Sequence, residues 1–580
     1  MKKVFSYLAA SKKRVAAGLA FKVAGTLAEL FLPLIMAHMI DDVAPARSVP
    51  ALALWSVLML LVAVAAWAGN VIANRFASKT ARDTTERLRS DLFAKTLSLS
   101  ARQADAVTLP SLVSRLSTDT YNVHNMIGMM QRMGIRAPIL LVGGVALTFT
   151  VDPVLALILL ISVPFLLVIV LFVAKRGIVL YTRLHNSVDV MVRKVRDDHT
   201  GIRVIKALSR SGYESDSFRT INADIVANET KANITTGISN PVMNVVLNLG
   251  MTAVIFFGAY RVAAGRVEVG GIVAFTSFFT VILNAVISIS RIFVDLSRGA
   301  ASAKRIEEVL ALPAELLPEQ CPADDSGAFI RFDSVTLSYG GAPALKNISF
   351  SVEKGGSLGV IGATGSGKST LVNLLMRFYD ADAGAVYIDG KNVKSYDPQA
   401  LREKFGVVFQ NDFLMAASVQ ENIDFERGLA SGQIERAAEH ARAAAFIGEH
   451  GGMEGHLTAR GSNFSGGQKQ RLLIARALAA SPEILVLDDS SSALDYKTDA
   501  QLRKTIVGDL RGTTVIMIAQ RISSVRFADH ILVLDGGRMV GFGTDEELMR
   551  TCEVYQRIYA SQHELGEDDV IKGGERYADE

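Results

Sequence analysis

Cysteine is nearly absent from this chain, since its 580 residues include only Cys321 and Cys552. Both lie in segments that the arguments below place in the cytosol, where thiols stay reduced. A disulfide framework and a cysteine-based zinc site are therefore not expected.

The chain also has no large excess of one charge, because 61 basic and 58 acidic residues leave a net charge of +3. No polyanion-binding tail is visible, and the basic residues stand mostly beside apolar runs, where anionic lipid headgroups would attract them. Membrane lipids are therefore an expected partner, and nucleic acid is not.

A cleavable signal peptide is not expected either. The basic N-terminus leads into an apolar run that is longer than a signal-peptide core and has no convincing cleavage site. We interpret this run as a retained helix. Hydrophobic residues, in contrast, make up 50% of the chain, and its length exceeds one ordinary domain, so a membrane-embedded part is expected.

Six apolar runs predict membrane spans. A helix needs about 20 mainly apolar residues to cross a hydrocarbon core about 30 Å thick. The third run is short, but the methionines before it extend it as a helix. The runs cover residues 15–40, 52–77, 134–150, 154–174, 241–262 and 271–296.

The basic residues orient these spans. Residues 175–231 are rich in lysine and arginine, whereas the loops after the first, third and fifth runs contain little beyond Arg47 and Arg266. Since positive loops stay inside, both termini are expected in the cytoplasm. The inner loops, roughly 78–133 and 175–240, are expected to be helical extensions, and residues 4–8 predict a short amphipathic helix on the inner leaflet.

The composition changes after a predicted charged helix at 298–310, where four helix-breaking residues mark a domain boundary. Beyond it, β-branched runs alternate with helical ones, which indicates an α/β domain. We therefore expect a transmembrane domain over 1–312, a linker over 313–327, an α/β domain over 328–562 and an acidic tail over 563–580.

The strongest chemical signal is the run GATGSGKST, which lies between an apolar strand and a helical segment. A phosphate-binding loop requires this context. Its glycines let backbone amides wrap a phosphate, its lysine neutralises phosphate oxygens, and its serine supplies a hydroxyl to magnesium. The run predicts an ATP and Mg²⁺ site that contains Gly362, Gly365, Ser366, Gly367, Lys368, Ser369 and Thr370.

Two further motifs follow the loop. The apolar run before Asp488 has the pattern of a buried strand that ends in a carboxylate, which holds magnesium-bound water in phosphate-loop enzymes. Between the loop and this strand, a serine and two glycines open a helix and expose amides toward an anion. This third motif comprises Phe464, Ser465, Gly466, Gly467 and Gln468.

The third motif resembles the signature of ATP-binding-cassette (ABC) transporters, which normally has leucine where Phe464 stands. The resemblance covers the whole chain and implies the type I ABC exporter (type IV ABC transporter) fold: an all-α, six-helix transmembrane domain fused to an α/β P-loop nucleotide-binding domain. It also implies that Tyr339 stacks on adenine, and that Gln410 links magnesium and the attacking water to the transmembrane part. Ser369, Gln410 and Asp488 would then hold Mg²⁺.

The resemblance further implies a second half-transporter as partner. In this family two cassettes meet head to tail, so each ATP lies between the phosphate loop of one chain and the signature of the other. The loop over residues 492–495 would touch the partner cassette. By family position, segments around 114–123 and 212–218 would supply the coupling helices, and the location would be a bacterial cytoplasmic membrane.

Two catalytic positions depart from the family pattern. Asp489 stands where a glutamate normally polarises the attacking water, and one methylene fewer displaces the carboxylate, which can cost about 100-fold in rate. Gln520 stands where a histidine normally senses the γ-phosphate, and glutamine cannot carry positive charge. Their combination resembles the altered subunit of heterodimeric bacterial multidrug exporters, although a slow homodimer stays an alternative.

The substrate follows only from the resemblance, which implies amphipathic drugs or other small hydrophobic compounds. Lipid, peptide and siderophore export stay open, as does a nucleotide-binding regulatory subunit that transports nothing. Polar residues in the spans line a cavity, form interhelical hydrogen bonds or snorkel toward the membrane surface. They are Arg136, Asn244, Asn248, Asn284 and Asp295.

Overall fold

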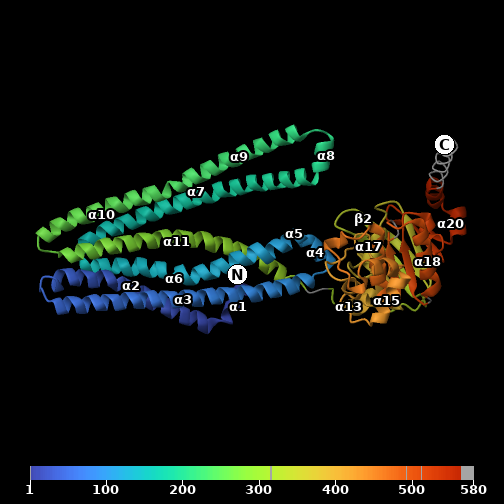
Figure 1. Cartoon of the computed structure of the whole chain (residues 1–580), viewed down its shortest axis with the longest axis horizontal. Coiled ribbons are helices and arrows are strands. Elements are labelled where there is room, and N and C mark those ends of the chain that lie inside the picture. Colours follow the sequence, from blue (N-terminus) through green and yellow to red (C-terminus); the bar gives the residue numbers. More distant parts are fainter. Residues whose placement is uncertain (1, 314–315, 491–492, 511, 563–580) are drawn as a thin grey trace. The chain divides into compact units, whose positions relative to one another are not determined.

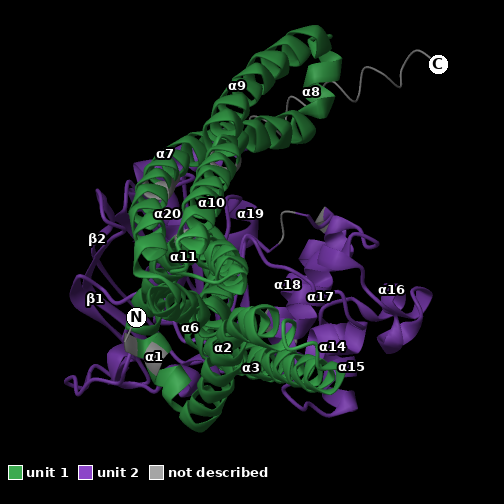
Figure 2. Ribbon diagram, turned by 90° about the vertical axis from the view of Figure 1, so that its left-hand side faces the viewer, with its two compact units in different colours: residues 1–97, 107–312 green, residues 98–106, 313–580 purple. Residues whose placement is uncertain are grey.

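The structure is a computed structural model that describes residues 2–313, 316–490, 493–510 and 512–562. Ser492 of the predicted partner-facing loop and the predicted acidic tail lie outside the described residues. The chain divides into two compact units, which Figure 2 draws in different colours. Unit 1 comprises residues 1–97 and 107–312, and unit 2 comprises residues 98–106 and 313–580.

Unit 1 is built from long helices, as Figure 1 shows. Residues 78–133 and 175–240 are mainly helical, as expected, and their position on the inner side of the membrane stays a prediction. The predicted charged helix at 298–310 is instead the continuous end of the last long helix. The helices of this unit and of the short inner segments are α1 (Lys2–Ala9), α2 (Lys12–His38), η1 (Met39–Val43), α3 (Val49–Leu97), α4 (Ala101–Val107), α5 (Leu109–Ser114), η2 (Arg115–Asp119), α6 (Thr120–Val151), α7 (Pro153–Thr200), α8 (Ile202–Ala207), α9 (Ser211–Gly237), α10 (Ser239–Ala263) and α11 (Val269–Leu310).

Each of the predicted spans falls within one helix of this unit or within a helix and its direct continuation. Among the described residues, five helical segments are long and apolar enough to cross a membrane, and Pro153–Ile169 is a shorter apolar stretch of α7. The shorter stretch corresponds to the fourth predicted span.

Small residues let the first two spans approach closely. A Cβ atom on Gly25 of α2 would lie 3.0 Å from the carbonyl oxygen of Ala66 in α3, and one on Gly69 would lie 3.1 Å from the Cα atom of Gly25. Such contacts favour helix packing in membranes, where apolar burial gives no advantage. The pair therefore sets the register between α2 and α3.

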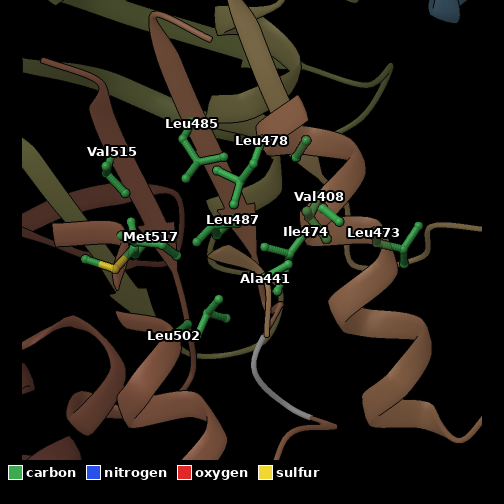
Figure 3. Packing of buried hydrophobic residues seen from close by; sticks show 14 of the residues in the cluster. Val408, Ala441, Leu473, Ile474, Leu478, Leu485, Leu487, Leu502, Val515 and Met517 are labelled. Carbon is green, nitrogen blue, oxygen red and sulfur yellow. The ribbon is translucent and has the colours of Figure 1, made fainter. Parts of the chain in front are cut away.

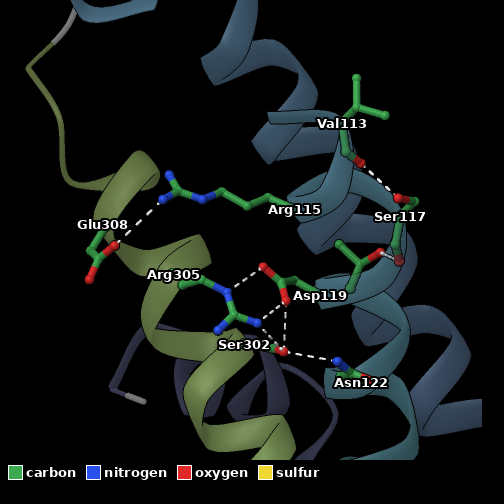
Figure 4. A network of polar contacts seen from close by, with 9 residues as sticks. Val113, Arg115, Ser117, Asp119, Asn122, Ser302, Arg305 and Glu308 are labelled. Atoms are coloured by element: carbon green, nitrogen blue, oxygen red, sulfur yellow. Dashed lines mark hydrogen bonds and ion pairs between the residues drawn. The ribbon is translucent and has the colours of Figure 1, made fainter. Parts of the chain in front are cut away.

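Polar side chains tie the C-terminal part of α11 to η2 and to the start of α6 (Figure 4). Asp119 is 1% exposed and accepts hydrogen bonds from the Ser302 hydroxyl at 2.8 Å and from Arg305 Nε at 2.9 Å. Asn122 donates to the Ser302 hydroxyl at 3.0 Å. The buried carboxylate is therefore satisfied by partners from another helix.

Unit 2 contains two sheets and the helices that cover them. One sheet is antiparallel in the order β2-β1-β4-β5, and the other has the order β10-β9-β3-β8-β7-β6, in which β10 alone runs antiparallel to its neighbour. The strands are β1 (Ile330–Ser338), β2 (Pro343–Val352), β3 (Ser357–Gly362), β4 (Ala383–Ile388), β5 (Lys391–Asn392), β6 (Phe405–Val408), β7 (Ile484–Asp488), β8 (Thr514–Ile518), β9 (His530–Asp535) and β10 (Arg538–Gly543).

The helices of unit 2 pack around these sheets, and short turns connect them. The helical elements are α12 (Lys368–Leu375), η3 (Val393–Ser395), α13 (Pro398–Arg402), α14 (Val419–Asp424), α15 (Ser431–His440), α16 (Ala444–Glu449), η4 (Gly452–Glu454), η5 (Ala459–Gly461), α17 (Gly466–Ala479), α18 (Tyr496–Asp509), α19 (Ile522–Val525) and α20 (Asp545–Thr551).

The parallel strands β7 and β8 are buried along their whole length, as continuous apolar strands are in parallel sheets. Their side chains Leu485 and Met517 belong to the same hydrophobic core as Ile474 and Leu478 of α17 (Figure 3). The carboxyl ends of β3, β7 and β8 lie at one edge of the sheet, because the three strands are parallel neighbours. Ligand sites in open α/β sheets form at this edge.

One segment of the first inner loop belongs to unit 2. Residues 98–106, which include most of α4, group with the soluble unit, whereas the predicted coupling segment 114–123 stays within unit 1. The Tyr379 hydroxyl donates a hydrogen bond to the Asp105 carboxylate. This hydrogen bond therefore lies within unit 2.

Candidate nucleotide site

The glycine-rich loop between β3 and α12 has a backbone that only glycine adopts without strain. Gly365 has φ +82° and Gly367 has φ +99°, both in the left-handed region. A Cβ atom on Gly367 would lie 2.7 Å from the carbonyl oxygen of Ala344. The loop therefore holds its backbone in a curve that exposes amide groups, the geometry that binds anions.

Lys368 is the first residue of α12 and turns back toward the loop. Its Nζ atom donates hydrogen bonds to the carbonyl oxygens of Gly362 and Ala363, both at 2.8 Å. Burial lowers the pKa of the Lys368 ammonium, while Asp488 and Asp489 oppose this shift. The cation is thus held at the loop, within reach of negatively charged groups.

Asp488 ends the buried strand β7 and is 4% exposed. Burial raises the pKa of its carboxyl group and the charge of Asp489 raises it further, whereas a hydrogen bond from Ser369 and the charge of Lys368 lower it. The Ser369 hydroxyl and the Asp488 carboxylate are therefore neighbours. Two oxygen donors of this kind suit Mg²⁺, which takes carboxylate ligands together with substrate phosphates.

These groups line one cavity of about 310 Å³ in unit 2. Residues from the loop, from β2 and from the ends of β6, β7 and β8 meet there, so elements far apart in sequence supply its walls. The lining residues are Tyr339, Ala344, Thr364, Gly365, Gly367, Lys368, Ser369, Thr370, Gln410, Asp488, Asp489, Ile518, Ala519 and Gln520.

Two predicted loop residues have a different place. Gly362 and Ser366 are absent from the described lining of the cavity. A Cβ atom on Gly362 would lie 2.2 Å from the carbonyl oxygen of Leu534 and 2.6 Å from the Ser366 hydroxyl. Both residues thus lie on the side of the loop that faces Leu534 of β9, away from the cavity. The Ser366 hydroxyl is buried and has no hydrogen-bond partner among the described residues.

The two residues that depart from the family pattern touch each other. Gln520 Nε2 donates a hydrogen bond of 3.2 Å to Asp489 Oδ2. Asp489 has φ +52°, and its backbone amide donates to the carbonyl oxygen of Ile518 at 2.9 Å. Adjacent parallel strands place both residues at the same edge, because Asp488 is paired with Ile518.

Tyr339 stands at the rim of the cavity, where 48% of its surface is exposed. Asn373 Nδ2 donates to its hydroxyl at 3.1 Å, and the ring of Tyr379 stands edge-on to it with centroids 4.9 Å apart. Sequence reasoning missed Tyr379, because no motif surrounds it and only its contacts identify its place.

The signature residues lie elsewhere in unit 2, and none of them is in the described lining of the cavity. Ser465 caps α17: its hydroxyl accepts from the Gln468 amide at 3.3 Å, and Gln468 Oε1 accepts from the Ser465 amide at 2.8 Å. The substituted Phe464 is 5% exposed and stacks on His450 with ring centroids 4.7 Å apart. The capped helix start and its two glycines are thus separate from the phosphate loop.

A helical membrane unit and a phosphate-loop unit on one chain define a membrane transporter ATPase.

Comparisons with known proteins agree with this class. Residues 15–286 match the family model of the ABC transporter transmembrane region, and residues 345–492 match the ABC transporter family model. An uncharacterized ABC transporter ATP-binding protein of Mycobacterium tuberculosis is 33% identical over 95% of this chain and 96% of its own length. The chain belongs to the ABC transporter family.

Other relatives and one solved structure are similar over most of the chain. The uncharacterized ABC transporter ATP-binding protein YfiB of Bacillus subtilis is 32% identical over 97% of this chain and 98% of its own length. A fatty acid ABC transporter ATP-binding/permease protein of Mycobacterium tuberculosis is 30% identical, over 87% of this chain and 80% of its own length. The structure of a bacterial Atm1-family ABC exporter with ATP bound has a TM-score of 0.81 at 24% identity, and the match covers 95% of this chain and 99% of that one.

Family and fold together make this chain an ABC half-transporter of exporter fold, a multi-pass membrane protein with a fused ATP-binding ATPase domain. The predicted fold class is therefore confirmed. A half-transporter acts with a second half, so the chain dimerises.

Proposed function

We propose that this chain is the degenerate-site subunit of a heterodimeric exporter, which drives amphipathic drugs or other hydrophobic compounds across a bacterial cytoplasmic membrane. The observation that carries the proposal is the hydrogen bond between Gln520 and Asp489. Both catalytic departures meet at one point of the cavity, so they act on the same water and the same phosphate.

The chemistry of this pair supports slow turnover. A general base has to reach the attacking water within about 3 Å, and the shorter Asp489 side chain also has one oxygen engaged by an amide. Gln520 donates hydrogen bonds but supplies no positive charge to a developing phosphate charge. This chain's phosphate loop would therefore bind ATP and turn it over slowly.

The remaining site residues would act as the resemblance implies. Tyr339 would stack on adenine and Lys368 would neutralise phosphate oxygens. Mg²⁺ would be held by Ser369, Asp488 and Gln410, whose oxygen donors line the same cavity. Ser465, Gly466, Gly467 and Gln468 would complete the partner's site, which would be the faster one.

Two alternatives have specific support. The fatty acid ABC transporter among the relatives favours an acidic lipid as cargo. A slow homodimer would explain the same altered residues without a second gene product. In both cases the membrane orientation, with cytoplasmic termini, would be the one that the basic inner loops predict.

The proposal is tested with inside-out vesicles that contain this chain alone, its candidate partner alone or both. ATP-driven uptake of hydrophobic dyes and fast ATP hydrolysis are expected only when both halves are present. Fast hydrolysis by a verified homodimer of this chain would contradict the degenerate site. Hydrolysis without flux of any cargo would favour a regulatory subunit.

A further inference from the structure

A cavity of about 560 Å³ lies within unit 1, between the helices α2, α3 and α6. It belongs to the membrane-spanning part and shares no residue with the nucleotide site. Its lining combines charged, amide and apolar side chains. The lining residues are Lys22, Glu29, Leu32, Ala63, Ala66, Trp67, Asn70, Asn74, Met129, Arg132, Met133 and Arg136.

The charges of this cavity do not balance. Its lining has three cations and one carboxylate, and that carboxylate, Glu29, is already paired with Arg136 at 2.7 Å. Lys22, only 3% exposed, donates to the Asn74 amide oxygen at 3.2 Å, and Arg132 donates to the Ser78 hydroxyl at 3.4 Å. Among the described residues, neither cation forms an ion pair with a carboxylate, although the charge of Glu29 also acts on Lys22.

Lys22 lies within a predicted span, where such a cation is costly, and Arg132 lies two residues before the start of another. Ionisable groups at this depth normally pair with one another or mark a ligand pathway. A buried ammonium whose described partner is a neutral amide is far from compensated, because charged groups need charge-assisted hydrogen bonds to offset desolvation. The lining therefore favours an anionic group beside Lys22 and Arg132.

Beyond the Glu29–Arg136 ion pair, the other end of the cavity is apolar. Leu32 lies ten residues beyond Lys22 on α2, and Ala63 lies eleven residues before Asn74 on α3, so each pair is separated by about 15 Å along its helix. Leu32 and Ala63 lie toward the same end of this helix pair, because α2 and α3 run antiparallel. Trp67 and Ala66 complete this wall. The cavity thus has Lys22 and Arg132 at one end and apolar side chains at the other, with the Glu29–Arg136 ion pair between them.

A second basic cavity adjoins the cationic end. It has a volume of about 620 Å³ and shares Asn74 with the first. Its lining includes Arg75 and Lys79, and also Arg82, which is paired with the Asp83 carboxylate at 2.8 Å outside the lining. A cleft of one charge sign with low-dielectric walls concentrates ligands of the opposite sign. An anion would therefore meet positive charge before it reaches Lys22.

We propose that the cavity between α2, α3 and α6 binds an acidic amphiphile, with its carboxylate or phosphate head between Lys22 and Arg132 and its hydrocarbon tail along Leu32, Ala63 and Trp67. This inference deepens the proposed function, on which it rests, because it names the class of cargo. It excludes cationic amphiphiles from this site.

The test uses Trp67 as a reporter, because the chain contains only this tryptophan and Trp55. The full chain, assembled with its partner half in nanodiscs and carrying Trp55→Phe, is titrated without nucleotide. The probes share one brominated tail and carry a carboxylate, a phosphate, a neutral hydroxyl or a trimethylammonium head. Bromine quenches tryptophan fluorescence on contact, so a bound tail lowers the fluorescence of Trp67. The variant Trp67→Phe, with Trp55 retained, reports quenching from the bilayer alone. The partner half is used in a form without tryptophan.

Saturable quenching by one or both acidic probes is expected, at a concentration at least about tenfold below that of the neutral and cationic probes. Lys22→Gln and Arg132→Gln should each weaken acidic binding by about tenfold, the effect of one lost charge-assisted hydrogen bond. Arg132→Lys should retain most of the affinity. The charge-matched controls are the single variants Lys12→Gln and Arg203→Gln, because both residues are exposed and lie outside the cavity.

Equal quenching by all heads would overturn the proposal, and so would unchanged acidic affinity in Lys22→Gln and Arg132→Gln. The head-group series on the unsubstituted cavity decides the question even if these variants fail to fold. Binding without ATP-driven flux would contradict the proposed export and leave this inference standing. ATP-driven flux without selectivity for acidic head groups would support the proposed export and contradict this inference.

Discussion

The Tyr379 hydroxyl donates a hydrogen bond to the Asp105 carboxylate, and the ring of the same tyrosine stands edge-on to Tyr339 at the rim of the nucleotide cavity. Burial and the Asp105 carboxylate raise the pKa of the Tyr379 hydroxyl above its ordinary value. Residues 98–106 therefore have a direct polar contact with the neighbour of the predicted adenine-stacking residue.

Loss of this hydrogen bond should impair coupling. Asp105→Ala and Tyr379→Phe are each expected to reduce cargo stimulation of ATP hydrolysis by about fivefold, a typical size for coupling between sites. The double variant should be no worse than either single variant, because both remove the same bond. The measurement is ATPase activity with and without cargo. Additive losses would show that the two residues act independently.

The division of labour between the two sites is tested with Gly466 and Asp489. A Cβ atom on Gly466 would meet only the Cβ atom of Ala493, at 3.6 Å, so the first atom of a new side chain has room there. Gly466→Asp places a negative charge at the signature. We expect it to lower hydrolysis by the heterodimer by about 100-fold or more, as loss of electrostatic stabilisation does. Asp489→Asn should change the rate by less than about threefold, since it removes a base from a slow site.

Matched expression and dimer assembly are required for this comparison. Ser465→Ala is a weaker probe, because it also removes the cap of α17, which costs about 1 kcal/mol. Abolished turnover in Asp489→Asn, together with intact turnover in Gly466→Asp, would assign the principal catalytic site to this chain.

Lys368→Ala should separate the two nucleotide sites. It removes the phosphate clamp of this chain only, so photolabelling of this subunit with azido-ATP should fall by at least about tenfold. Labelling at the partner's phosphate loop should persist. Lys354→Ala, a lysine outside the cavity lining, is the matched control. Equal loss at both sites would contradict the assignment of Lys368.

The network around Asp119 should stabilise unit 1. Asp119→Ala leaves Arg305 without this carboxylate, and breaking such a buried contact costs about 2 kcal/mol. Thermal unfolding in nanodiscs should therefore occur at a lower temperature. Asp216→Ala breaks an exposed ion pair with Arg219 at 2.9 Å and should cost less than about 0.5 kcal/mol. Equal melting temperatures for the two variants would show that the network contributes no stability.

The sequence by itself determined the helical membrane part and the ATP-binding cassette. Both depend on local signals: apolar runs of spanning length, and the contiguous motifs around Lys368 and Ser465. The same signals predicted the strand that ends at Asp488. These inferences need no knowledge of packing, because hydropathy and loop chemistry belong to short stretches of chain.

Only the tertiary structure decided which distant residues meet. Asp105 and Tyr379 are 274 residues apart, and no local pattern predicts their hydrogen bond. Sequence reasoning singled out Arg136 but missed Lys22 and Glu29, although two charges within one apolar run were a usable signal. The cationic cavity arises because helix register, set by close packing at glycines such as Gly25, brings Lys22 and Arg132 to a common face. Register depends on side-chain packing between helices, which hydropathy along a single run does not encode.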